Sequence, residues 1–296
     1  MSHSLHGDPK KAGPQPSFPK QDQESPGLES KMDPKPDYGE ASYKGSAKLT
    51  DKVAVITGGD SGIGRAVALA YAREGAHCVI SYLNEDTDAQ ETQAAVEKEG
   101  RKCLLIPGDI SQESQCKKII DTAVKEFGHI DILVNNAAFQ GKSVDDISKL
   151  DRERVEYTFR TNIISMFDLV RLAVPHMKKG SAIINVGSIQ AYDPSAEILD
   201  YATTKAAIVG FTKGLASQLM EKGIRVNCVA PGPVWTPLVI ASFPKTKNAE
   251  FGKNYPIKRP AQPRELAPAF VFLASGECSS YISGEVLGVT GGEVLA

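Results

Sequence analysis

The 296-residue sequence lacks the features that would place the protein in a membrane, outside the cell or on nucleic acid. No apolar run approaches the roughly 18 to 20 residues that a bilayer-spanning helix needs. Residues 1–20 contain no apolar stretch that resembles the core of a signal peptide. The formal net charge of −2 indicates no basic groove for nucleic acid. We therefore expect a cytoplasmic protein whose partner is a small molecule, with no membrane and no nucleic acid involved.

Cysteines are few and show no metal-binding or redox spacing. Their number is odd, and no two of them form a C-x-x-C pair. This pattern favours reduced thiols over a disulfide framework, and it offers no ligand set for a structural metal. We expect no metal site. The five cysteines are Cys78, Cys103, Cys116, Cys228 and Cys278.

Aliphatic residues are scarce in residues 1–50, which are rich in proline, glycine, serine and lysine. A segment of this composition cannot bury enough apolar surface to fold alone. We expect an extended tail that is either disordered or anchored by Met32, Tyr38 and Tyr43. In the second case the tail would lie across the domain or a neighbouring subunit.

From Asp51 onwards, short β-branched runs alternate with segments of helical spacing. Buried strands that alternate with amphipathic helices indicate βαβ units and a parallel sheet. Right-handed crossovers then make the sheet doubly wound. No break divides residues 51–296, so we predict one α/β domain. Its seven expected strands are residues 53–57, 78–82, 103–106, 130–135, 182–186, 224–229 and 286–289.

A glycine-rich run follows the first expected strand directly and precedes a helical segment. This order is the context of a dinucleotide-binding fingerprint. Gly58 allows the tight turn, Gly62 lets the backbone approach a pyrophosphate, and Gly64 permits close packing of helix and strand. The free N–H groups of the helix would then face the phosphates. The spacing is GxxxGxG rather than GxGxxG, and a purely structural turn is the alternative.

The end of the second expected strand bears on the choice of nucleotide. An acidic residue there selects NAD, whereas an arginine favours NADP; this strand ends in Ser-Tyr-Leu-Asn and has neither. Ser61, Tyr82 and Asn84 could donate hydrogen bonds to a 2′-phosphate, while Asp60 and Glu85 argue the other way. We expect NADP, with NAD as the alternative.

Polar residues also follow the third and fourth expected strands. Ligands of open α/β sheets bind at the carboxyl ends of the strands, and both Asp109 and Asn136 lie there. Asp109 could accept a hydrogen bond from an adenine amino group. Alternatively, it caps the next helix.

Tyr201 and Lys205 are four residues apart, so on a helix their side chains share one face. An ammonium beside a phenol stabilises the ionised tyrosine, which can then transfer a proton near neutral pH. Ser188 ends the fifth expected strand and lies at the same edge of the sheet. A YxxxK string alone arises easily by chance. In register with Ser188 and the glycine loop, it indicates a proton-transfer site beside a nucleotide.

In this order, the motifs resemble those of the short-chain dehydrogenase/reductase family over residues 51–296. The N-terminal extension and the sequence Gly-Asp-Ser at 59–61 are similar to a glucose/ribitol dehydrogenase-like or aldehyde reductase-like subgroup. The resemblance implies a single NAD(P)-binding domain with a Rossmann-type doubly wound sandwich and a seven-stranded parallel sheet. The motifs are TGxxxGIG at 57–64, Asp109, NNAx at 135–138, Asn162, Ser188, YxxxK at 201–205, and Pro231-Gly232.

The resemblance also implies roles for individual residues. Tyr201 would be the general acid and base, and Lys205 would lower its pKa and bind the nicotinamide ribose. Ser188 would orient the substrate oxygen, and Asn162 would hold a water molecule that links Lys205 to solvent. The expected cofactor-binding set is Gly58, Ser61, Gly62, Ile63, Gly64, Tyr82, Asn84, Asp109, Ile110, Asn136, Ala137, Ala138, Tyr201, Lys205, Pro231, Gly232, Val234 and Thr236.

Residues 233–262 have an irregular pattern and would form a substrate lid at the ligand edge of the sheet. With Gln190, Tyr192 and Trp235, this lid would line a pocket of mixed polarity. The expected substrate contacts are Ser188, Gln190, Tyr201 and Trp235. We predict hydride transfer between a nicotinamide cofactor and a small alcohol or carbonyl compound, such as a sugar, polyol or aldehyde.

Two alternatives stay open. A 3-ketoacyl-thioester reductase would need a basic docking patch near the pocket, and a nucleotide sensor would keep the fold without turnover. A sugar-nucleotide epimerase shares the Tyr/Lys pair but usually carries GxxGxxG and a larger C-terminal domain, and this chain has neither. The family is commonly a homotetramer, a dimer of dimers, and the apolar residues 286–296 could lie between subunits. The basic patch would comprise Lys245, Lys247, Lys253, Lys258 and Arg259.

Overall fold

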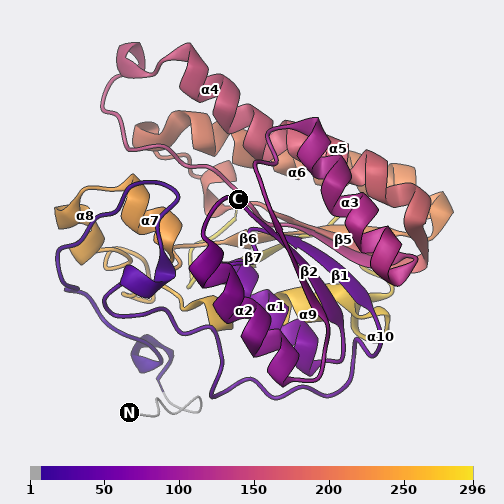
Figure 1. The fold of residues 1–296 in the computed structure, drawn as a ribbon. Helices are drawn as coiled ribbons and strands as arrows, with labels where there is room; N and C mark the ends of the chain where they lie inside the picture. The colour runs from indigo at the N-terminus through magenta and orange to yellow at the C-terminus, as the bar shows by residue number, and fades with distance from the viewer. Residues whose placement is uncertain (1–7, 296) are drawn as a thin grey trace.

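Seven parallel strands form one sheet in the computed structural model of the protein, which describes residues 8–295. The strand order β3-β2-β1-β4-β5-β6-β7 is that of a doubly wound sheet, and it confirms the predicted fold class (Figure 1). The strands are β1 (Val53–Thr57), β2 (His77–Tyr82), β3 (Cys103–Pro107), β4 (Ile130–Asn135), β5 (Met177–Val186), β6 (Arg225–Pro231) and β7 (Val286–Val289).

The largest difference from the predicted strands is the start of β5, at Met177 rather than residue 182. Met177 pairs with Ile130 on β4, and the register shifts before the regular ladder resumes at Ala182. The intervening lysines and glycine are exposed, so no apolar pattern marks this part of the strand.

Helices cover both faces of the sheet (Figure 1). One face carries α1 (Gly62–Arg73), α2 (Asp86–Lys98), α9 (Pro263–Ala274) and the short α10 (Gly276–Ser279). The other carries α3 (Glu113–Phe127), α4 (Arg152–Phe159), α5 (Ser165–Ala173) and α6 (Leu199–Leu219). Within residues 8–295, no helix has the length and apolarity to cross a membrane.

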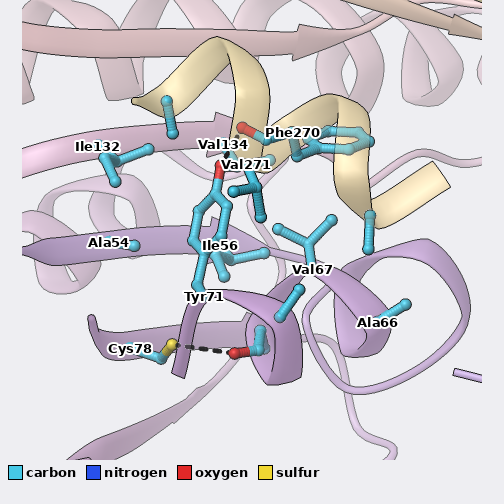
Figure 2. Close-up of a cluster of buried hydrophobic side chains, with 14 of the residues drawn as sticks. Ala54, Ile56, Ala66, Val67, Tyr71, Cys78, Ile132, Val134, Phe270 and Val271 are labelled. Carbon is cyan, nitrogen blue, oxygen red and sulfur yellow. Dashed lines mark hydrogen bonds between the residues drawn. The ribbon is translucent and has the colours of Figure 1, made fainter. Parts of the chain in front are cut away.

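The core on the α1–α9 face shows why these elements pack so closely. Tyr71 of α1 is completely buried, and its hydroxyl donates a 3.2 Å hydrogen bond to the Phe270 carbonyl of α9 (Figure 2). Burying a tyrosine is favourable when its polar end finds such a partner. On the same face, the Cys78 thiol contacts the Ala68 carbonyl at 3.6 Å. All five cysteines lie within the described residues and are free thiols.

The described part of the tail, residues 8–50, lies against the domain rather than in solvent (Figure 1). Met32 is 3% exposed, and Tyr38 and Tyr43 pack against the α1–α9 core. The Tyr43 hydroxyl donates to the Glu74 carboxylate at 2.6 Å. Anchoring of the tail by these residues is therefore confirmed within one chain, and the disordered interpretation is wrong for residues 8–50. Leu49 already belongs to the core, and the domain boundary near residue 50 stays a proposal.

The expected irregular lid contains two short helices, α7 (Pro237–Ser242) and α8 (Lys245–Ala249). A proline at the first position favours the start of α7. Just before α7, Trp235 is completely buried against Phe18 of the tail, with ring centroids 4.3 Å apart. Its indole N–H donates to the Pro34 carbonyl at 2.8 Å. The tail therefore covers the outer side of the lid.

Replacing Phe18 with alanine tests this contact, because Trp235 is the single tryptophan of the chain. Loss of a buried phenylalanine should lower Tm by about 5–10 °C. Tryptophan emission should also shift to longer wavelength as water reaches the indole. Lys20→Ala, at an exposed tail position, is the control. Unchanged Tm and emission in Phe18→Ala would show that the tail is not docked on Trp235.

Candidate active site

A cavity of about 670 Å³ lies at the carboxyl edge of the sheet and reaches beneath the lid. It brings together residues that are far apart in the sequence, from the carboxyl ends of β1 to β6. The expected site residues that line it are Gly58, Ser61, Gly62, Ile63, Tyr82, Asp109, Ile110, Asn136, Ala137, Ala138, Ser188, Gln190, Tyr201, Lys205, Pro231, Gly232, Val234 and Thr236.

The glycine loop has no room for side chains at two positions. A Cβ at residue 64 would lie 1.9 Å from the Gly58 carbonyl oxygen, so only glycine lets α1 start this close to β1. Gly58 itself has φ +61°, in the left-handed region that favours glycine. The Asn136 amide donates to the Thr57 and Gly58 carbonyls at 2.9 Å each. Asn136 therefore joins the end of β4 to the loop. The result is a cradle of backbone at the positive end of a helix, which suits a phosphate group.

The end of β2 differs from the expectation in two ways. Asn84 is exposed and lies outside the cavity, because the chain turns there and its backbone N–H donates to Glu85 at 2.8 Å. Tyr82 lines the cavity, but its hydroxyl donates to Asp86 at 2.6 Å. Asp60 and Glu85 also line it. Burial, assisted by the Glu85 charge and opposed by a smaller effect of Ser61, raises the pKa of Asp60 to about 7.

Ser188, Tyr201 and Lys205 meet at the centre of the cavity. Ser188 follows β5 and accepts a 3.1 Å hydrogen bond from the Gln190 N–H, while Tyr201 and Lys205 lie in the first turns of α6. The Lys205 ammonium lies 5.2 Å from the centroid of the Tyr201 ring and donates to the Val186 carbonyl at 2.7 Å. A hydroxyl, a phenol and an ammonium thus converge on one point, where they can hold an oxygen atom and move a proton.

The surrounding protein groups raise the pKa of Tyr201, whereas the sequence predicted that Lys205 would lower it. Burial raises this pKa, and interaction with the Ser188 hydroxyl lowers it by less. Burial also lowers the pKa of Lys205 to about 8. Desolvation disfavours the charged form of both groups. It outweighs the attraction between an ammonium and a phenolate at this separation.

Asn162 lies behind the cavity, in a π-helical turn (Arg160–Ile164) between α4 and α5. Its side chain accepts from the Phe139 N–H at 2.7 Å and donates to the Phe139 carbonyl at 2.9 Å. It also donates to Thr204 at 3.0 Å. Asn162 therefore ties the loop after β4 to α6 beside Lys205. A π-helical turn inside a helix frequently marks a functional site.

Two aromatic residues expected in the pocket are elsewhere. Trp235 points away from the cavity into the tail, because Phe18 and Pro34 provide its apolar and polar partners. Tyr192 is also outside the lining, whereas Phe243 and Tyr255 of the lid are part of it. The expectation that Trp235 and Tyr192 line the pocket is wrong.

Sequence patterns missed several residues of the site. Ser25 and Pro26 of the tail line the cavity, and nothing in a Pro/Gly-rich segment indicates which of its residues contact a site. Gln140 also lines the cavity and is 5% exposed, with no partner for its buried amide nitrogen within the described residues. Its position soon after the Asn-Asn-Ala motif is the one signal that could have identified it.

A doubly wound parallel sheet whose carboxyl edge joins a glycine loop to a serine, a tyrosine and a lysine defines a Rossmann-type oxidoreductase. The chain belongs to the short-chain dehydrogenase/reductase family. The family model described as enoyl-(acyl carrier protein) reductase matches residues 58–293. The family resemblance found in the motifs is therefore confirmed.

Curated relatives and solved structures are similar over most of the chain. NADPH-dependent aldehyde reductase 1 of Arabidopsis thaliana chloroplasts is 50% identical, over 91% of this chain and 96% of the relative. Glucose and ribitol dehydrogenase of Daucus carota is 49% identical, over 94% and 97%. L-sorbose reductase of Gluconobacter frateurii, solved with NADPH and L-sorbose, has a TM-score of 0.76 and 35% identity, covering 82% of this chain and 97% of that one.

The buried ammonium predicts how stability changes with pH. The folded protein releases the Lys205 proton near pH 8, whereas the unfolded chain releases it near 10.5. This lowered pKa adds a pH-dependent contribution to the free energy of unfolding. The contribution is fully present above pH 10.5 and is lost as the pH falls to about 8. Between pH 7 and pH 9.5, wild-type protein should therefore gain about 2 kcal/mol of unfolding free energy relative to Lys205→Met.

Urea denaturation at the two pH values measures this difference. Lys213→Met, which changes an exposed lysine on the same helix, should follow the wild-type pH dependence. A constant difference between wild type and Lys205→Met would mean that Lys205 titrates near its ordinary pKa.

Proposed function

We propose that the protein is an NAD(P)-dependent oxidoreductase that transfers a hydride between nicotinamide C4 and a small alcohol or carbonyl substrate. NADP(H) is the preferred cofactor. The observation that carries this proposal is the convergence of Ser188, Tyr201 and Lys205 in one cavity with the glycine loop. The catalytic set is completed by Asn162, which holds α6 in place.

The residues of the cavity suit a dinucleotide. The glycine loop would hold the pyrophosphate, Asp109 the adenine, and Lys205 the nicotinamide ribose. Pro231, Gly232, Val234 and Thr236, after β6, would bind the carboxamide and fix which nicotinamide face reacts. The cofactor supplies the hydride when it is bound.

The protein supplies orientation and a proton. In reduction, the Ser188 hydroxyl donates a hydrogen bond to the carbonyl oxygen and the Tyr201 hydroxyl gives its proton to the same oxygen. In oxidation, Tyr201 Oη takes the proton from the alcohol. Lys205 holds a positive charge beside the phenol, which opposes the cost of ionising the buried tyrosine without removing it. Asn162 positions the turn of α6 that carries both residues.

The polarity of the cavity supports a hydroxylated substrate. Gln140, Gln190, Asp193 and Asn254 line it together with aromatic lid residues. Gln190 already accepts from the Ser195 N–H at 2.7 Å, so its amide N–H groups are available as donors. The names of the carrot and Arabidopsis relatives support a sugar, polyol or aldehyde.

The preference for NADP(H) rests on the relative named as NADPH-dependent and on the buried state of Asp60. A pKa of Asp60 near 7 leaves part of this carboxyl group uncharged at neutral pH. Asp60 would then repel the 2′-phosphate of NADP(H) less strongly than a fully ionised aspartate would.

Carrier-protein substrates are disfavoured because the expected basic patch is largely paired. Lys245 lies 3.2 Å from Asp22, Lys253 lies 2.6 Å from Glu250, and Lys247 pairs with Glu197. Arg259 is buried against Glu265. Little free positive charge is left to attract an acidic carrier. A nucleotide sensor without turnover is the second candidate.

We also propose a cytoplasmic homotetramer. Large apolar side chains are exposed on α5 and its neighbours, with Phe167 at 55% and Ile164 at 49%. Val294 near the C-terminus is 76% exposed. Burying such groups between copies of the chain would remove them from water.

The reaction is tested by absorbance at 340 nm with both cofactors and a panel of polyols, sugars, aldehydes and a ketoacyl thioester. We expect turnover of a sugar, polyol or aldehyde, with higher kcat/KM for NADP(H). Cofactor binding without turnover of any compound would favour the sensor. Preferential turnover of the thioester would favour the acyl reductase.

Tyr201→Phe removes the proposed proton donor while preserving the ring. We expect kcat to fall by about 10³-fold or more, within the range for loss of a general acid, with the Kd of the cofactor changed by less than about threefold. Tyr192→Phe, close to Ser188 but outside the cavity, should retain wild-type kcat. Near-normal turnover in Tyr201→Phe would remove Tyr201 from the mechanism.

A further inference from the structure

Residues 17–37 of the tail, which we call the strap, lie between the substrate lid and the glycine loop. At the lid, the Phe18 N–H donates to the Ala249 carbonyl at 2.8 Å. The Asn248 amide donates to the Gln21 carbonyl at 3.0 Å. The strap therefore starts against α8 and continues towards α1 and α2 (Figure 1).

The middle of the strap reaches the cavity itself. Ser25 and Pro26 line it, and Gly27 passes so close to the lid that a Cβ there would lie 3.0 Å from the Pro237 carbonyl oxygen. Its φ of +83° also favours glycine. The strap thus forms part of the wall of the active site.

Glu29 of the strap binds the glycine loop but is not among the residues that line the cavity. Its side chain is 3% exposed. One carboxylate oxygen accepts the Gly62 N–H at 2.6 Å, and the other accepts from Arg65 at 2.9 Å. The backbone N–H of Glu29 donates to Asp88 of α2 at 2.7 Å. One tail residue therefore joins the start of α1 to α2.

The same group of residues holds the preceding part of the loop. Arg65 Nε donates to the Asp60 carbonyl at 2.9 Å, and the Thr92 hydroxyl donates to it at 2.8 Å. Gly62 has φ +52°, a conformation that a glycine leaves easily because many others are open to it. Hydrogen bonds on both sides of the loop, to Asp60 and to Gly62, fix its path where the phosphates would bind.

Burial, more than ion pairing, limits the charge of Glu29, because one arginine is shared by three carboxylates. Arg65 pairs with it and also with Asp88 and Glu91. Burial raises the pKa of Glu29 to about 7, although Arg65 and the Gly62 N–H lower it. Its contribution to the loop is thus a hydrogen-bond acceptor rather than a free negative charge beside a pyrophosphate.

We propose that Glu29 is a positioning residue for the cofactor pyrophosphate. By holding the Gly62 N–H and Arg65, it keeps the glycine loop in the conformation that directs the other free N–H groups of α1 at the phosphates. This inference rests on the proposed function, since the pyrophosphate belongs to NAD(P). The strap is then part of the active site.

The test is calorimetric titration of purified full-length protein with NADP+ at 25 °C, combined with steady-state kinetics. Glu29→Ala removes the acceptor and should raise the Kd about tenfold, as expected for a buried hydrogen bond to a charged group. Glu29→Gln keeps one acceptor oxygen for the Gly62 N–H but loses the acceptor for Arg65, so its Kd should rise by a smaller factor, about threefold. At saturating cofactor, kcat should stay within about twofold in both variants.

Glu24→Ala is the matched control, because this strap carboxylate is 88% exposed and pairs with Lys142 at the surface. Its Kd should equal that of wild type. Thermal melting shows whether each variant is folded at 25 °C. Should Glu29→Ala not fold, Glu29→Asp takes its place, since the shorter side chain retains the charge but withdraws the acceptor from Gly62, and the same rise in Kd is expected.

Three outcomes would overturn the inference. A Kd for Glu29→Ala that is within twofold of wild type, or lower, would show that Glu29 does not position the loop. An equal loss in Glu29→Gln would assign the effect to the Arg65 ion pair and overturn the role of the Gly62 contact. If wild-type protein binds neither NADP+ nor NAD+, the proposed function fails and this inference fails with it. Normal binding by wild type and Glu29→Ala alike would remove the inference alone.

Discussion

The active site depends on the close backbone contact between α1 and the end of β1. A Cβ atom at residue 64 would lie 1.9 Å from the Gly58 carbonyl oxygen. Helix α1 can therefore pack this close to the end of β1 only with glycine at residue 64. The position of this first turn fixes where the N–H groups of α1 point, and residues from other elements hydrogen-bond to the same loop. Asn136 at the end of β4 donates to the Gly58 carbonyl, and Glu29 accepts the Gly62 N–H. The geometry of the phosphate-binding part of the site therefore depends on the close approach of the α1 backbone to the backbone at the end of β1.

Burial gives the catalytic pair its unusual properties. Tyr201 and Lys205 are nearly removed from water, and desolvation favours the uncharged form of each. Lys205 is therefore easier to deprotonate and Tyr201 harder, the reverse of what adjacency on a helix predicts for the tyrosine. The Val186 carbonyl binds the ammonium at 2.7 Å, which fixes its direction. Positioning of the lysine is thus a property of the fold, whereas activation of the tyrosine needs further positive charge near its ring.

Residues of the domain that follow regular patterns could be predicted from the sequence. Six of the seven strands begin within a residue of their expected starts, because their apolar runs are continuous and buried. Ser188, Tyr201 and Lys205 meet because strand ends and helix starts in such a sheet share an edge. Trp235 and Asn84 were misplaced since their surroundings come from elsewhere in the chain. An indole next to a predicted pocket gives no sign that Phe18, over 200 positions earlier, covers it.

The tail shows why composition alone fails for such segments. A segment with few aliphatic residues cannot form its own core, but it can complete the core of another unit. Met32 and Phe18 pack with Trp235 and Ile240 of the lid region. The backbone of the tail is satisfied by side chains of the domain: Arg73 donates to the Gly39 and Tyr43 carbonyls, and Glu74 accepts the Ser46 and Lys48 N–H groups. Because its partners are side chains at fixed positions, the tail has one path over the lid and the glycine loop. A segment so placed cannot shift without disturbing both parts of the site.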